Sequence, residues 1–445
     1  MRDRMPAPGK ENRVRITQDN GQSIEGVLSY ADDAAQPGSC YNRANVMPDG
    51  ICDAFALDRI SSEPKDLFAV LSAIPDGKGM LVVSCKESDG SPCAGAVWTV
   101  TRRLSVTPID INMIGVTNIN GISCFLLPPG KYQLTAFPPI DFCSIGGRFI
   151  TTVQVGRVTR LNRVFYAQSG TSNTRIFDSA VTGAFSKHVA RADVFAVGGG
   201  GGGGCVLQIR GEGYSVAAAG GAGGFTQTAS NIPLVPYKIT IGAGGTAPAL
   251  TTWADGRANG TGGGSTIVES LDGAKLLTAS GGEGGQVTIS GSLNQLYIRG
   301  ASGGSGSGAL SEGQVGTNGF DGASGGGFTT SSGMSVPGGS GQGRTTRAFA
   351  EPGGELYASA GQSNCNGAAQ AVGAGGGLSA YRYLDNSVDA VQLYGGAGTT
   401  HGAGGGPALI RCLNTPMHYV SATSVDLRGG DGRGGMVMFR WEVNS

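Results

Sequence analysis

Short apolar runs, separated by turn residues, fill the middle of the chain. Between residues 77 and 168, Asp89-Gly90, Asn120-Gly121 and Pro129-Gly130 indicate turns. The runs have the length and the period of β-strands, and no helical periodicity competes with them. The predicted strands are Met80–Cys85, Ala94–Val100, Ile122–Leu127, Lys131–Ala136, Phe149–Val155 and Val158–Tyr166. Six or seven short strands of this kind predict a β-sandwich of about 90 residues.

A β-hairpin is predicted near the N-terminus. Arg13–Thr17 alternates like a half-buried strand, Asp19-Asn20-Gly21 supplies a turn, and Ser23–Leu28 returns as a second strand. An isolated hairpin is marginal in water, so this one needs a partner surface, either other copies of itself or another protein. Residues 37–46 are expected to form a turn and a short helix.

Glycine dominates the second half of the chain. From residue 196 to the end lie 64 of the 81 glycines, and seven of them are consecutive: Gly198, Gly199, Gly200, Gly201, Gly202, Gly203 and Gly204. Glycine loses more backbone freedom on folding than any other residue. An ordered region therefore concentrates it only where backbones approach more closely than a Cβ allows.

Patterned strands beside the glycines argue against disorder in this region. They are Tyr237–Ile241, Leu276–Ala279 and Met436–Trp441, and no Gly-X-Y period indicates collagen. The sequence predicts extended glycine segments of threefold, polyproline-II-like geometry, here called polyglycine-II-like. Contacts of about 0.5–1 kcal/mol each must offset an ordering cost of about 1–2 kcal/mol per residue, so only a packed array is stable. The threefold geometry and the marginal hairpin together predict a homotrimer.

The predicted fold class is therefore all-β. We expect an N-terminal attachment module at 1–60, a linker with one helical turn at 61–76, a β-sandwich at 77–168 and a glycine-rich domain at 169–445, about three domains for this length.

Charge and hydropathy exclude two classes of partner. The chain has 32 basic and 32 acidic residues, and only 14% of its residues are charged. No basic field favours nucleic acid, and no stretch approaches the roughly 18 apolar residues of a membrane helix. Because no apolar segment follows the charged start of the sequence, we expect no secretory signal.

Candidate catalytic and metal chemistry is sparse. Nine cysteines and three histidines show no zinc-type spacing, and no Gly-Lys-Ser or Gly-Lys-Thr marks a phosphate loop. The cysteines are interpreted as buried thiols, although Cys85, Cys93, Cys124 and Cys143 share one predicted domain and could pair if oxidised. We expect no cofactor, no metal and no enzymatic activity.

Aromatic residues and arginines in the glycine-rich part are the best candidates for recognition. Aromatic faces and arginine forks suit the surfaces of sugars and polar polymers. The candidates are Trp253, Tyr297, Arg299, Tyr381, Arg382 and Tyr383. An alternative remains open, in which these rings fill gaps between the glycine segments.

The N-terminal residues resemble a known attachment module. The matching stretches are 4–17, 24–27, 31–34 and 37–39, with a weaker match at 40–44. They are similar to the N-terminal module of tail fibres and related virion proteins from tailed phages and prophages of Gram-positive bacteria. The resemblance implies attachment of the chain to a phage particle.

Residues 79–166 resemble the Cna-B-type, or carboxypeptidase-regulatory-like, β-sandwich. The resemblance rests on Asp89-Gly90 before Pro92 and Val97, on Thr117-Asn118 with Gly121, and on Leu127–Tyr132. In surface adhesins such domains can carry a Lys–Asn isopeptide bond. Lys86 stands near the expected lysine, but no matching partner is apparent, so we predict no crosslink.

Residues 180–443 resemble the glycine-rich C-terminal domain of phage tail fibres, through five stretches in the same order. These are 193–204, 223–226, 237–245, 262–266 and 429–437. The resemblance implies a structural virion protein, a tail fibre or adhesin that binds the phage tail or baseplate through residues 1–60. Its glycine-rich domain would bind a glycan or protein of the bacterial surface. The alternatives are a head fibre or capsid decoration protein, or a bacterial surface adhesin.

Overall fold

The computed structural model describes most of the chain from residue 77 onward. The described residues are 13–17, 23–27, 51, 52, 57, 64, 67, 77–102, 111–140, 142, 148–155, 157–165, 173–210, 213–291, 296–311, 314–413 and 420–443. They are almost entirely strands, turns and extended segments, so the fold is all-β as predicted. No helix within these ranges is long and apolar enough to cross a membrane. The chain forms two compact units, Met1–Ser72 and Ala73–Ser445.

The first unit contains the predicted hairpin. Strands β1 (Arg13–Thr17) and β2 (Ser23–Val27) pair antiparallel, with Arg13 opposite Val27 and Thr17 opposite Ser23. The turn and short helix predicted at 37–46 lie outside the described residues. The finer division of the N-terminal part at residues 60 and 76 stays a prediction.

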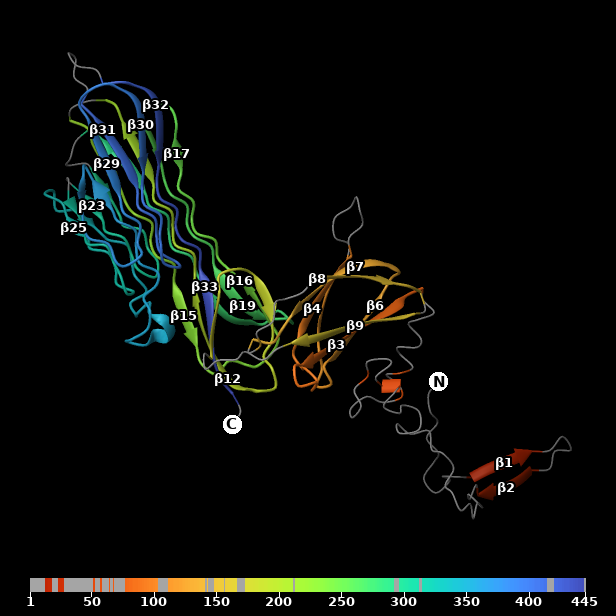
Figure 1. Ribbon diagram of the computed structural model, residues 1–445. Helices are drawn as coiled ribbons and strands as arrows, with labels where there is room; N and C mark the ends of the chain where they lie inside the picture. Colours follow the sequence, from red (N-terminus) through yellow and green to blue (C-terminus); the bar gives the residue numbers. More distant parts are fainter. Residues whose placement is uncertain are drawn as a thin grey trace. The chain divides into compact units, whose positions relative to one another are not determined.

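Seven strands form the predicted β-sandwich (Figure 1). One sheet has the order β6-β3-β9 and the other the order β5-β4-β7-β8. The strands are β3 (Gly79–Glu87), β4 (Val97–Arg102), β5 (Ile111–Val116), β6 (Ile122–Leu127), β7 (Gly130–Phe137), β8 (Arg148–Val153) and β9 (Val158–Phe165). Most contacts between neighbours are antiparallel, and β3 and β9 pair parallel.

The structure corrects the sequence prediction at two strands of the sandwich. The strand predicted from Ala94 begins at Val97, because residues 94 and 95 form a turn in which Gly95 has a φ of +82°. Strand β5 was not predicted. It contains Gly115, where an added Cβ would lie within 3.0 Å of the Phe125 ring, so this edge strand approaches β6 too closely for a regular apolar alternation.

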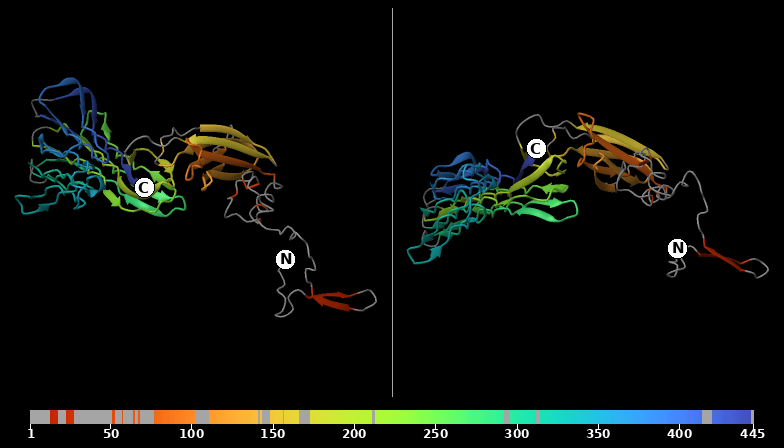
Figure 2. Two further views of the ribbon diagram at one scale, coloured as in Figure 1. Left: turned by 60° about the horizontal axis from the view of Figure 1, so that its bottom comes forward. Right: turned by 90° about the horizontal axis from the view of Figure 1, so that it is seen from below.

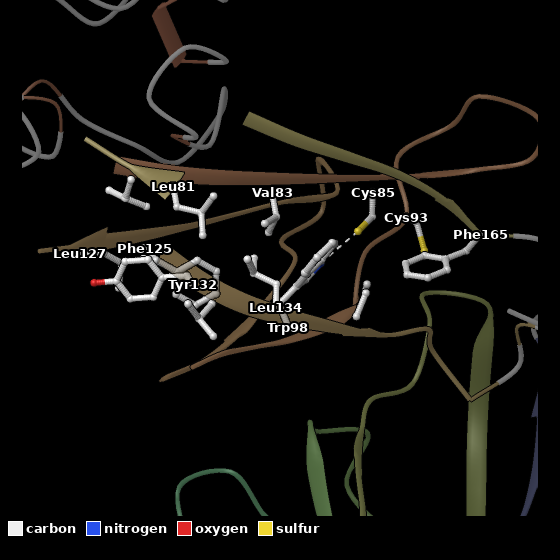
Figure 3. Close-up of a cluster of buried hydrophobic side chains, with 14 of the residues drawn as sticks. Leu81, Val83, Cys85, Cys93, Trp98, Phe125, Leu127, Tyr132, Leu134 and Phe165 are labelled. Atoms are coloured by element: carbon white, nitrogen blue, oxygen red, sulfur yellow. Dashed lines mark hydrogen bonds between the residues drawn. The ribbon is translucent and has the colours of Figure 1, made fainter. Parts of the chain in front are cut away.

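The sandwich core is built around Trp98 (Figure 3). Trp98 is fully buried, and its indole Nε1–H donates a hydrogen bond to Sγ of Cys85 at 3.2 Å. Its ring lies 5.7 Å from that of Phe149, centroid to centroid. Lys86, the next residue after Cys85, is exposed, so its amine lies outside this core.

Several cysteines are buried thiols, as one of the two interpretations expects. Cys85, Cys205 and Cys412 are free and buried. Burial raises the pKa of Cys85 to about 12, of Cys205 to about 11 and of Cys412 to about 12, which keeps these thiols protonated and unreactive at neutral pH. Cys143 lies outside the described residues.

The glycine-rich region places its strands at two ends, with long extended segments between them (Figures 1 and 2). We call the end that contains β12 and β33 the base end. It contains the sheets β10-β33-β12-β15 and β11-β16-β19-β20. Their strands are β10 (Thr174–Phe177), β11 (Val181–Gly183), β12 (Val189–Val197), β15 (Thr226–Ala229), β16 (Tyr237–Thr240), β19 (Thr266–Ser270), β20 (Lys275–Ala279) and β33 (Met436–Val443).

We call the other the turn end, because short connections join its strands. Its sheets are β17-β32-β30, β18-β13-β31-β29, β21-β14-β27-β28 and β22-β23-β24. The strands are β13 (Cys205–Gln208), β14 (Ser215–Ala218), β17 (Ala249–Leu250), β18 (Gly256–Ala258), β21 (Val287–Ser290), β22 (Tyr297–Ile298), β23 (Leu310–Ser311), β24 (Gln314–Val315), β27 (Asn364–Cys365), β28 (Ala368–Ala369), β29 (Ala380–Leu384), β30 (Val388–Tyr394), β31 (Ala408–Cys412) and β32 (Ala422–Arg428).

The run of seven glycines connects β12 at the base end to β13 at the turn end. Its amides donate hydrogen bonds to three neighbouring segments in turn, so every third residue returns to the same neighbour. As the residue number rises by three in the run, it falls by three in the partner, so these neighbours are antiparallel. The acceptors of Gly198 to Gly203, in order, are the carbonyls of Phe225, Gly264, Arg433, Ala222, Thr261 and Gly430, all at 2.9 Å.

Three further segments surround the same run and lie parallel to it. An added Cβ on any of Gly198 to Gly203 would lie less than 3.0 Å from a backbone oxygen of one of them, again with a period of three. These oxygens belong to Ser280, Ala243, Ala403, Glu283, Thr246 and Gly406. Carbonyls of the run accept hydrogen bonds from the same three segments, for example from Gly282 to Gly199 at 2.9 Å and from Gly245 to Gly200 at 2.7 Å. The run is therefore enclosed by six segments of its own chain, and most of its backbone groups are hydrogen-bonded to them.

Candidate functional site

The turn end is a stack of four sheets with three apolar layers between them. Strand β13 contributes to two layers, because Cys205 and Leu207 point into one apolar cluster and Val206 into the next. Strand β14 continues the pattern with Val216 and Ala217 in adjacent clusters. Strands buried on both faces read as continuous apolar runs. This stack holds the short connections of the turn end in place.

A pocket of about 350 Å³ opens at the turn end, beside β18 and β21. Asp255 forms an ion pair with Arg210 and accepts a hydrogen bond from the backbone N–H of Ile209 at 2.7 Å. The guanidinium of Arg210 also lies over the ring of Tyr214, 5.7 Å from its centroid. The hydrogen bond and the charge of Asp255 raise the pKa of Arg210 above its ordinary value. Arg257 completes the charged lining of the pocket and is exposed.

The sequence-predicted recognition residues are spread over three different parts of the turn end. Trp253 is partly buried against the cluster between the sheets of β17 and β13, so its ring fills a gap. Tyr297, on β22, is 47% exposed. Arg299 follows β22 and forms an ion pair with Glu283, with N–O distances of 3.4 and 3.5 Å.

The other three candidates are adjacent on the edge strand β29. Tyr381 is partly buried, and its ring occupies the space that a side chain on Gly367 would need. Burial raises the pKa of Tyr381. Tyr383 is 44% exposed, with the guanidinium of Arg411 5.8 Å from its ring centroid, and Arg382 is exposed. Arg382 and Tyr383 therefore remain open to a partner, whereas Trp253 and Tyr381 pack against the protein.

A family model described as a glycine-rich domain matches residues 177–442, which is more than half of the chain. The chain belongs to this glycine-rich domain family. The matched residues run from β10 to β33 and include both ends of the region and all the segments between them. No curated protein is detectably similar to the chain in sequence.

Solved structures with local similarity to the chain include three bacterial surface proteins. The Bacillus anthracis TIE protein is 8% identical, with 48% of this chain and 43% of that chain covered and a TM-score of 0.19. A streptococcal ancillary pilin is 9% identical, with 48% and 59% covered and a TM-score of 0.18. The major pilin subunit BcpA of Bacillus cereus is 9% identical, with 58% and 91% covered and a TM-score of 0.19. The match spans less than two thirds of the first two proteins, and TM-scores this low carry no argument about this chain.

A second pocket, of about 390 Å³, lies at the base end of the glycine-rich domain. Three of its charged lining residues, Arg191, Asp193 and Arg440, are already engaged in ion pairs. Asp193 forms ion pairs with Arg191 at 3.4 Å and with Arg440 at 3.2 Å, and Arg440 also pairs with Glu351 at 2.7 Å. This network ties β12 to β33 and is structural. Within the described residues, no group of three or more His, Cys, Asp or Glu side chains is arranged to hold a metal ion.

The sequence did not single out Arg210, Tyr214, Asp255 and Arg257. Each stands in or beside a short connection at the turn end, 209–214 or 251–257, in a context that is ordinary for a turn. The signal that could have found them is charge. Two arginines and two acidic residues, Glu212 and Asp255, fall in these two connections, which is a local concentration in a weakly charged domain.

Proposed function

We propose that the chain is a structural virion protein, a tail fibre or adhesin that binds the host cell surface through the turn end of its glycine-rich domain. One observation carries the proposal. Strands β10 and β33, the first and last of the domain, pair with each other at the base end. The domain is therefore attached to the rest of the chain at that end, and the turn end is free to present its connections outward. The resemblance of the N-terminal residues to phage attachment modules also supports attachment to a particle through the N-terminal side of the chain.

The glycine segments form, in this proposal, a polyglycine-II-like lattice that keeps the two ends apart. Helices of this type have three residues per turn and no internal hydrogen bonds. The period of three in the hydrogen-bond partners of Gly198 to Gly203 supports it. A lattice of this kind is stiff, because each backbone is held on all sides, and it suits a spacer that presents a binding surface.

The partners and the location follow from the same proposal. Residues 1–60 would bind a phage tail or baseplate protein, and the turn end would bind a glycan or protein of the bacterial surface. The protein would assemble in the host cytoplasm, remain in the virion after lysis and act without enzymatic activity. Co-purification with isolated tails supports the tail fibre, and co-purification with capsids supports a head fibre or decoration protein instead.

The proposal includes a homotrimer. Of the two reasons for it in the sequence, one remains. The threefold glycine geometry was expected to bring several chains together, but all six neighbours of the glycine run belong to one chain. The marginal hairpin β1–β2 is the remaining reason to expect three chains. A sedimentation mass of one or two chains would remove the trimer.

Host binding is tested with the full-length protein, fluorescently labelled, on a panel of Gram-positive bacteria. We expect binding to at least one strain. The double variant Arg382→Ala/Tyr383→Ala, which removes two exposed side chains of β29, should reduce that binding about tenfold or more, as loss of an interface hot spot does.

The matched control is Lys238→Ala at the base end, whose exposed ion pair with Glu269 is 3.2 Å long. Its binding and its melting temperature should equal those of the wild type, because exposed pairs contribute little. Equal loss in both variants, or binding to none of the bacteria, would contradict a host-binding turn end.

A further inference from the structure

The pocket beside β18 and β21 at the turn end has features of a ligand site that the sequence alone did not predict. From its geometry we infer that the pocket lined by Arg210, Tyr214, Asp255, Arg257, Ile289 and Gly291 binds an acidic saccharide, with the anionic group of the sugar on Arg257. The inference rests on the proposed function, since it names the class of ligand that the turn end would recognise.

Charge selects the acidic group. Asp255 is already engaged by the Arg210 guanidinium and by the N–H of Ile209. Arg257 is exposed, and no ion pair within the described part of the chain involves it. Among the described residues that line the pocket, two guanidinium groups therefore stand against one carboxylate. A guanidinium binds a carboxylate or phosphate through two parallel N–H···O bonds, which makes an anionic group its preferred partner.

The aromatic ring and the glycine beside it favour a saccharide over a simple anion. Arg210 covers one part of the Tyr214 ring. Gly291 lies against another part, where an added Cβ would be only 3.4 Å from Cε1 of the ring. Without a side chain at position 291, the ring stays open to the pocket. The apolar face of a sugar ring packs against an aromatic ring, so Tyr214 gives the pocket a surface on which a sugar ring can lie.

The size of the pocket agrees with a small part of a polymer. A volume of about 350 Å³ lies at the low end of the range for small-molecule sites. It accommodates one or two sugar rings and leaves the rest of a longer glycan outside. Individual affinity would then be weak, and repeated copies on a particle would strengthen attachment through avidity.

The test is saturation-transfer NMR on the full-length protein with soluble probes. The probes are glucuronic acid, glucose 6-phosphate, neutral glucose and the dipeptide Gly-Asp. We expect transfer to one or both acidic sugars, and at least tenfold weaker binding of glucose and of the dipeptide. A preference between glucuronic acid and glucose 6-phosphate identifies whether a carboxylate or a phosphate is recognised.

Three variants make the test specific. Arg257→Gln should weaken binding of the acidic sugar at least tenfold, and Gly291→Leu, which covers the tyrosine ring, should abolish it. Lys238→Gln removes a positive charge at the base end and should change nothing. All three should keep the melting temperature of the wild type, because the substituted side chains are exposed or face the pocket.

The inference is overturned if no sugar binds at a concentration of about 20 mM, if glucose binds as well as glucuronic acid, or if Arg257→Gln binds like the wild type. Equal binding of Gly-Asp would overturn the saccharide class and leave a carboxylate site for peptides. Host-cell binding without sugar binding would remove this inference and leave the proposed function intact. Sugar binding without host-cell binding would leave this inference intact and remove the proposed function.

Discussion

Replacing Gly201 by alanine should destabilise the glycine-rich domain by about 3 kcal/mol or more. The added Cβ would lie less than 3.0 Å from the carbonyl oxygen of Glu283 and from the next backbone atoms, none of which can rotate away as a side chain can. The backbone of 280–286 would have to move, and with it the hydrogen bonds that it shares with the run. Gly201→Val should be more severe, because its branched side chain needs still more room. Denaturant unfolding of the full-length protein measures the effect.

Gly434→Ala is the matched control within the same set of segments. There an added Cβ would meet its nearest neighbour, the carbonyl oxygen of Gly242, at an ordinary contact distance of 3.5 Å. We expect its stability to stay within about 0.5 kcal/mol of the wild type, since alanine also reduces the freedom of the unfolded chain. Equal stability of Gly201→Ala and Gly434→Ala would mean that the glycine run is not packed as described.

Replacing Asp193 by asparagine should cost about 2 kcal/mol, the second largest effect that we expect. Asp193 is only 8% exposed, accepts a hydrogen bond from the backbone N–H of Asn231 at 2.9 Å and pairs with Arg191 and Arg440. Asparagine keeps the shape and one acceptor but removes the charge that both guanidinium groups face. Because Arg440 is partly exposed and keeps Glu351, the cost is smaller than for a fully buried pair.

Glu269→Gln provides the comparison for Asp193→Asn, because it removes one carboxylate charge from an exposed ion pair at the same end of the domain. It should cost less than about 0.5 kcal/mol. Calorimetric unfolding of both variants and the wild type separates the two cases. A loss for Asp193→Asn no larger than for Glu269→Gln would contradict the structural role of the network.

The carboxylate of Asp193 also predicts that the stability of the domain depends on pH. Burial alone would raise the pKa of Asp193, but the N–H of Asn231 and the guanidinium groups of Arg440 and Arg191 outweigh it and lower the pKa below its ordinary value. A lowered native pKa contributes stability above the unfolded pKa, near 4, and this stability is lost as the pH falls through the native pKa. The wild type should therefore lose stability below about pH 4, and Asp193→Asn should show a shallower decline over that range.

Local sequence signals predicted the two hairpin strands and most strands of the sandwich. The predicted turn residues Asp19-Asn20-Gly21 lie between β1 and β2 in the sequence, and paired turn residues separate β3 from β4, β5 from β6 and β6 from β7. Strand β5 escaped prediction because its close approach to β6 requires Gly115, which interrupts the apolar pattern. In the second half, the packing of glycine segments could be predicted, because nothing else orders so many glycines.

Which glycine segments meet could not be read from the sequence. The partners of Gly198 to Gly203 lie in segments as distant as 430–433, and one glycine segment looks like another. The pairing is set by the sheets at the two ends, whose register depends on strands far apart in the chain. For the same reason Arg210 and Asp255, which are brought together by the pairing of β13 with β18, could not be recognised as neighbours.

The most direct test of the packed glycine run is amide hydrogen exchange of the full-length protein, resolved to peptides covering residues 198–204. The amides of Gly198 to Gly203 each donate a 2.9 Å hydrogen bond inside the domain. They should exchange about a thousandfold or more slowly than in an unfolded chain, like those of the adjacent strands β12 and β13. Exchange of the run at the unfolded rate, between two protected strands, would contradict the account and reduce the run to a tether.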